Sequence, residues 1–110
     1  MTDRFRLTKP AIQDIEEIAD YIAQESGLEK SERFLSKLES KFSQIVTFPL
    51  IGRKRDEILT NIRTIQLDNY LILYLPILHG RGFANGDEIE ILRVVSGYRD
   101  LSTLFTDVDE

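Results

Sequence analysis

The residues of this chain best suited to chemistry lie just beyond its last predicted strand. An apolar run ends at Gly97, and Tyr98, Arg99 and Asp100 follow at once, before a short helical pattern. This order places a guanidinium and a phenol at the rim of a sheet, where a guanidinium can hold a phosphate or a carboxylate through two hydrogen bonds. Asp100 could instead cap the helical turn that follows. The sequence therefore predicts a binding role for Arg99, with Tyr98 beside it.

Four other arginines could contribute to the same kind of binding. Two of them stand in a basic loop, Gly52-Arg53-Lys54-Arg55, after the second predicted helix. A structural role is the alternative. The basic loop would then be a solvated turn, which is the interpretation we prefer for each of its residues taken singly. The strand arginines, Arg63 and Arg93, would pair with acidic strand neighbours such as Asp68 or Glu90. The candidates for binding a target are Arg99, Tyr98, Arg93, Arg63, Arg53 and Arg55.

The sequence predicts no catalytic residue, no metal site and no cofactor. The chain has no cysteine and one histidine, His79, in a glycine-rich loop where we expect a solvated side chain. A metal site needs several converging ligands, and nucleophilic catalysis needs a nucleophile beside a base. The sequence also contains no Gly-x-x-x-x-Gly-Lys run that could cradle a phosphate. Carboxylate pairs such as Glu16 and Glu17 fall on expected solvent faces.

Length and charge narrow the function classes further. The 110 residues, of which 42% are hydrophobic, predict one domain over 1–110 with a real core. The net charge of −5 argues against general nucleic-acid binding, and we expect no direct sequence-specific DNA binding by this chain alone. Absence of cysteine, of a signal peptide and of a membrane-length apolar run predicts a cytoplasmic protein with no membrane contact.

The pattern of apolar residues predicts an α+β domain. Residues 4–8 alternate as a short strand, and two amphipathic helices follow, from Pro10 to Ser26 and from Leu28 to just before Phe48. Tyr21, Phe34 and Phe42 fall on the helical stripes and are expected in the core. The expected fold is an N-terminal strand, an antiparallel helical hairpin, a three-strand antiparallel meander (61–67, 70–77 and 87–96) in one sheet, and a short C-terminal helix.

Four segments together resemble the ParE branch of the RelE/ParE toxin superfamily. They span residues 5–105 in the order and spacing of that family. They are the opening strand and first helix at 7–23, the loop Phe48-Pro-Leu-Ile-Gly-Arg53, the strands Ile62-Arg63 and Tyr70-Leu-Ile-Leu-Tyr74, and the close Ile91-Leu-Arg-Val-Val-Ser-Gly-Tyr-Arg-Asp-Leu101.

The resemblance implies a toxin of a type II toxin–antitoxin pair. ParE-like toxins are described as poisons of DNA gyrase, whereas RelE-like relatives cut messenger RNA on the ribosome. A cognate ParD-like antitoxin, a toxin–antitoxin hetero-oligomer and gyrase as the target are therefore the expected partners. Where RelE-like relatives carry basic residues and a late tyrosine, this chain has Gln66, Leu71 and Phe105. Phenylalanine cannot transfer a proton, which favours binding over cleavage.

Two alternatives to a gyrase-binding toxin remain. One is a RelE-like ribosome-dependent mRNA endonuclease, and the other is an inert homologue that only binds an antitoxin. In each case a partner segment is expected on the sheet, because strand 70–77 is apolar on both faces and a helical hairpin covers only one. The residues expected to bind the antitoxin are Tyr70, Ile72, Tyr74 and Leu92.

Overall fold

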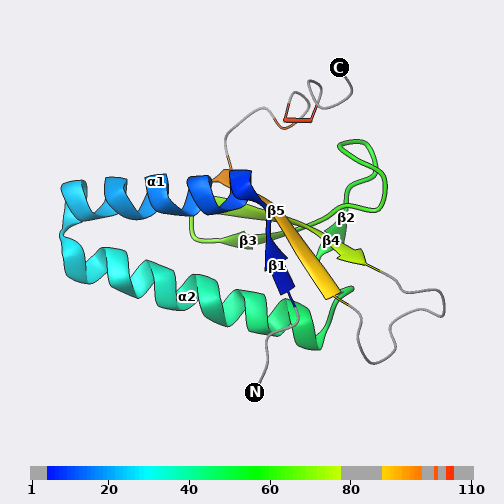
Figure 1. The fold of residues 1–110 in the computed structure, drawn as a ribbon, viewed down its shortest axis with the longest axis horizontal. Coiled ribbons are helices and arrows are strands. Elements are labelled where there is room, and N and C mark those ends of the chain that lie inside the picture. The colour runs from blue at the N-terminus through cyan, green and yellow to red at the C-terminus, as the bar shows by residue number, and fades with distance from the viewer. Residues whose placement is uncertain (1–4, 78–87, 98–100, 102–103, 106–110) are drawn as a thin grey trace.

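A computed structural model describes residues 5–77, 88–97, 101 and 104–105 (Figure 1). The elements follow the predicted order. They are β1 (Phe5–Leu7), α1 (Lys9–Ser26), α2 (Leu28–Thr47), β2 (Arg53–Lys54), β3 (Arg63–Leu67), β4 (Tyr70–Ile77) and β5 (Glu88–Ser96). The predicted loop around His79 lies outside the described residues. Within the described part, neither helix is long and apolar enough to cross a membrane.

The two helices form an antiparallel hairpin whose ends are set by Thr8 and Gly27. The Thr8 hydroxyl accepts a hydrogen bond from the Ala11 N–H at 3.1 Å and donates to the Leu92 carbonyl at 2.9 Å, so one side chain caps α1 and ties it to β5. Gly27 ends α1 at a φ of 101°, a conformation that favours glycine, and α2 begins at the next residue. Farther along, the Ser31 hydroxyl donates to the Ala19 carbonyl at 2.7 Å, which joins the two helices.

The five strands form one mixed sheet in the order β1-β5-β4-β3-β2. The predicted antiparallel meander of β3, β4 and β5 is confirmed, with a tight turn at Asp68 and Asn69. Two features go beyond the prediction: β1 pairs in parallel with β5, and part of the basic loop becomes the short edge strand β2. The sheet therefore brings the start of the chain beside its last strand.

The core lies on both faces of the sheet. On the helical face, α1 and α2 pack against β4 and β5, and the wholly buried side chains there include Ala11, Ile45, Ile72, Tyr74 and Ile91. On the opposite face, Ile62, Leu73 and Val95 are buried under a partly buried layer made by Ile58, Leu71, Leu92, Leu101, Leu104 and Phe105. Of the expected C-terminal helix, a turn is described, in which the Leu104 N–H donates to the Leu101 carbonyl.

Candidate functional site

Arg93, a predicted target-binding residue, is engaged by a helix carboxylate. Its guanidinium donates two hydrogen bonds to Asp14 on α1, from Nε at 2.6 Å and from a terminal nitrogen at 2.9 Å. The same carboxylate accepts the Val94 N–H at 3.0 Å. The hydrogen bonds to Asp14 raise the pKa of Arg93. Arg93 therefore fastens α1 to β5. The structural alternative expected an acidic partner on a neighbouring strand, but the partner, Asp14, lies on a helix.

Arg63, a second predicted binding residue, holds the loop between α2 and β2. Its guanidinium donates to the carbonyls of Leu50 at 3.2 Å and Gly52 at 2.8 Å. The buried Tyr74 hydroxyl accepts the Gly52 N–H and donates to the Pro49 carbonyl, both at 2.8 Å. A side chain at position 52 would begin 2.6 Å from that hydroxyl, so only glycine fits there. These contacts give a physical reason for the spacing of proline, glycine and arginine in this loop.

The remaining predicted cations are exposed, ion-paired or outside the described structure. Arg53 and Lys54 are exposed on the edge strand β2. Arg55 pairs with Glu57, and this hydrogen bond lowers the pKa of the Glu57 carboxyl. Tyr98 and Arg99, on which the sequence interpretation placed most weight, lie outside the described residues. A binding role for each of these residues stays a prediction.

The four residues predicted to contact an antitoxin are distributed over two faces. Tyr70, Ile72 and Tyr74 belong to the helical side, where Ile72 and Tyr74 are wholly buried. Leu92 packs on the opposite face with Leu73 and Val95. Tyr70 is half-buried and lies where the β3–β4 turn approaches the two helices. Of the three residues on the helical side, Tyr70 is the one whose side chain reaches open solvent in this conformation.

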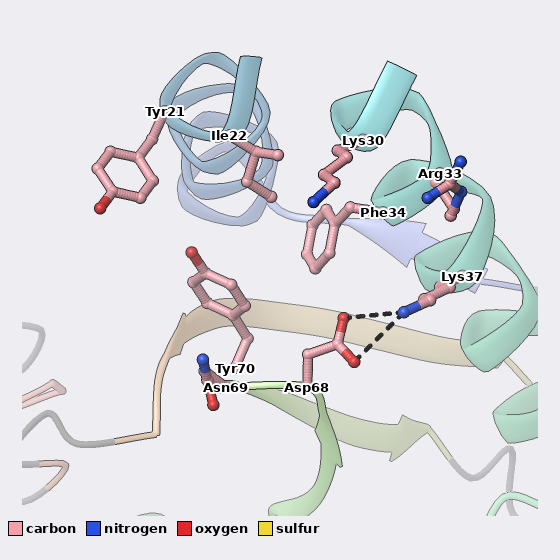
Figure 2. Close-up of a pocket in the computed structure, with 9 residues that line it drawn as sticks. All are labelled: Tyr21, Ile22, Lys30, Arg33, Phe34, Lys37, Asp68, Asn69 and Tyr70. Atoms are coloured by element: carbon pink, nitrogen blue, oxygen red, sulfur yellow. Dashed lines mark hydrogen bonds and ion pairs between the residues drawn. The ribbon is translucent and has the colours of Figure 1, made fainter. Parts of the chain in front are cut away.

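The Tyr70 side chain forms one wall of an open groove of about 630 Å³ between the helical hairpin and the β3–β4 turn (Figure 2). Phe34 meets Tyr70 edge to face, with ring centroids 5.3 Å apart and planes at 60°. Tyr21 projects from the side of α1 away from α2, at the edge of the same groove, and is 59% exposed, so its predicted place in the core is wrong. Burial raises the pKa of Tyr70, and the nearby Tyr21 phenol adds to that rise.

Positive charge lines the α2 side of this groove. Lys30, Arg33 and Lys37 stand at helical spacing on α2, and the Lys37 ammonium lies 3.4 Å from the Asp68 carboxylate (Figure 2). A second hollow, of about 240 Å³, adjoins the first, and Asp14 and Glu17 are among its lining residues. Tyr21 and Tyr70 line both hollows. Sequence reasoning missed the groove, although the basic spacing on α2 was a visible signal.

Comparisons with known proteins found a matching family model, a similar protein and a solved structure with a similar fold. The family model described as "ParE toxin of type II toxin-antitoxin system, parDE" matches residues 5–101. The chain is 25% identical over 95 residues to Toxin ParE3 of Caulobacter vibrioides, covering 86% of this chain and 87% of that protein. It also resembles a solved structure titled "Chromosomal ParDE TA system from P. aeruginosa", with a TM-score of 0.65, 20% identity, and coverage of 84% of this chain and 92% of that one.

Proposed function

The chain belongs to the ParE toxin family of type II toxin–antitoxin systems, and on this premise we propose that it inhibits DNA gyrase by binding. We further propose that a cognate ParD-like antitoxin neutralises it in a toxin–antitoxin hetero-oligomer. The observation that carries the proposal is the family match over residues 5–101, which includes Tyr98 and Arg99.

The side chains at the positions of RelE-type catalysis support binding over cleavage. Gln66 donates its amide to the Asp68 carbonyl at 3.0 Å and has no group that titrates near neutral pH. Leu71 and Phe105 pack against the buried cluster on the sheet face opposite the helices. None of these three side chains can take up or release a proton in RNA cleavage.

The contacts of Arg93 and Arg63 narrow the set of proposed target-binding residues. Both guanidinium groups hold structural contacts within the chain, so they are not free to grip a target. Arg99, with Tyr98, remains the proposed contact, and the exposed Arg53 supplies a second positive position. For the antitoxin, Tyr70 is the proposed contact that needs no rearrangement of the core.

The test combines growth, gyrase activity and transcript integrity. We expect expression without antitoxin to arrest growth, the purified chain to inhibit gyrase supercoiling, and added antitoxin to restore it. Arg99→Ala should abolish the arrest while leaving the thermal melt and antitoxin binding nearly unchanged. Cleaved transcripts with intact gyrase would establish the RelE-like alternative, and normal growth with intact antitoxin binding would establish an inert homologue.

A further inference from the structure

We propose that the groove between α1, α2 and the β3–β4 turn binds a peptide segment of a protein partner with a defined charge order. In the bound peptide, acidic residues would lie over α2 and an apolar side chain between Tyr21 and Tyr70. A basic residue of the peptide would lie beside Glu17 on α1. The antitoxin is the first partner to examine, and that choice alone rests on the proposed function. The groove itself follows from the contacts below.

The cations of α2 are available to a partner's carboxylates. In the described part of the chain, no carboxylate lies within ion-pair distance of Lys30. Arg33 pairs with Glu29 one turn away at 3.3 Å, and both side chains are mostly exposed. Lys37 is half exposed in its 3.4 Å pair with Asp68. Exposed pairs of this kind contribute little to stability, so an acidic segment can replace them at small cost.

The centre of the groove is aromatic and already ordered. The contact with Phe34, a buried residue, fixes the Tyr70 ring from the α2 side, and Tyr21 extends from α1 at the opposite edge of the groove (Figure 2). Two aromatic walls of this kind, one fixed and one exposed, suit an inserted leucine or aromatic side chain. An exposed tyrosine that faces another tyrosine across an opening is therefore the anchor point of the proposed site.

The far end of the groove carries the opposite charge. Glu17 is exposed on α1 and accepts a long hydrogen bond of 3.4 Å from Gln13, while Asp14 is held by Arg93. Glu17 therefore has lone pairs to offer a lysine or arginine of the partner. Because one end is positive and the other negative, a segment with the matching order of charges binds in one orientation.

This charge order favours a peptide over a nucleic acid. A phosphodiester chain carries negative charge along its whole length, so its course past Glu17 and the neighbouring acidic face of α1 would be repulsive. A peptide can place carboxylates over Lys30 and Lys37 and a cation over Glu17 within one short segment. The groove is also open and shallow, which suits a segment laid along the surface more than a small molecule enclosed in a cavity.

The experiment measures binding of a fluorescent synthetic peptide to the purified chain. The peptide has a glutamate block, a leucine–tryptophan centre and a lysine block, and a scrambled peptide of the same composition is the reference. We expect the block peptide to bind at least roughly tenfold more tightly than the scrambled one. Tyr21→Ala should weaken binding roughly tenfold, whereas Tyr21→Phe should keep it, because the ring and not the hydroxyl makes the contact.

Charge reversal gives the matched control. Lys30→Glu is expected to weaken binding of the block peptide roughly fivefold. Lys9→Glu changes the net charge equally but lies about 12 Å along α1 from Glu17, the nearest proposed charged contact, and about 18 Å from Tyr21. Both distances exceed the Debye length of about 8 Å, so binding should be unchanged. Both sites are exposed, and a thermal melt confirms that each variant folds.

Three results would overturn the proposal. They are equal binding of the scrambled peptide, equal weakening by Lys9→Glu and Lys30→Glu, and displacement of the peptide by single-stranded oligonucleotide at matched concentration. The last result would assign the groove to nucleic acid. The chain could bind the block peptide and yet neither arrest growth nor inhibit gyrase. That result would support the groove proposal and contradict the proposed toxin activity, so failure of one proposal can be told from failure of the other.

Discussion

Tyrosines and cations hold the backbone in place near β2, whereas at the β3–β4 turn they border an open groove. At the β2 end, Tyr74 is wholly buried and its hydroxyl, together with Arg63, holds the backbone of residues 49–52. At the β3–β4 turn, Tyr70 and Tyr21 border an open groove whose cations have weak, exposed partners or none among the described residues. Residue type alone therefore does not separate a structural contact from a recognition surface; burial and the number of hydrogen bonds do.

The same distinction applies to the predicted arginines. Arg93 and Arg63 donate to fixed acceptors, whereas Arg53 is exposed on the edge strand. Substitutions at the first kind of site are expected to act on stability, and substitutions at the second kind on binding. The predictions below examine this division from its largest expected effect to its smallest.

The largest effect is expected at Asp14. Asp14→Ala leaves the Arg93 guanidinium, whose side chain is 20% exposed, and the Val94 N–H without their carboxylate partner. Removing one member of such a pair should lower the free energy of unfolding by about 3 kcal/mol, measured by urea denaturation. Glu17→Ala, on the next turn of α1 at an exposed position, should change it by less than about 0.5 kcal/mol. Equal losses in the two variants would contradict a fastening role for Asp14.

Local patterns predict much of the fold, because spacing within a segment encodes it. The apolar stripes of α1 and α2 and the turn at Asp68-Asn69 are of this kind. Pairing of β1 with β5 and of Asp14 with Arg93 joins residues far apart in the chain, and no local pattern names such partners. Tyr21 was misplaced for a related reason: helical periodicity indicates a stripe, but not where the sheet beneath that stripe ends.

The next largest effect is expected at Gly52. In Gly52→Ala the new Cβ would lie 2.6 Å from the Tyr74 hydroxyl and 2.9 Å from the Thr64 carbonyl. The loop must shift and lose its hydrogen bonds, so we expect a loss of about 2 kcal/mol in the free energy of unfolding. Gly97→Ala is the control, since its Cβ would come no closer than 3.4 Å, to the Asn69 carbonyl. Unchanged stability of Gly52→Ala would show that the hydrogen bonds of Tyr74 and Arg63 do not fix the backbone of residues 49–52.

A smaller effect is expected from Tyr74→Phe. The lost hydrogen bonds to Pro49 and Gly52 should cost about 1 kcal/mol at neutral pH. Burial raises the pKa of Tyr74, so its neutral form stabilises the fold fully below the unfolded pKa of about 10. This contribution is lost as pH rises through the higher folded pKa.

Denaturation across the alkaline range measures this titration. Stability of the parent should fall above about pH 10 more steeply than that of Tyr74→Phe, because the variant lacks the phenol. Comparing the two proteins at each pH cancels the titration of lysines, which both share. Parallel declines would indicate that Tyr74 does not govern the alkaline limit.

The smallest effect on stability is expected at the groove itself. Lys37 and Asp68 are each about half exposed, and their atoms are 3.4 Å apart. A double-mutant cycle with Lys37→Ala and Asp68→Ala should give a coupling of at most about 0.5 kcal/mol in unfolding, and less at high salt. Lys37→Ala should nevertheless weaken binding of an acidic peptide, while Asp68→Ala should leave it equal or tighter because Lys37 is then freed. A coupling free energy as large as the stability lost in Asp14→Ala would mean that the Lys37–Asp68 pair stabilises the fold. The groove would then not differ from the β2 end of the sheet in the way proposed.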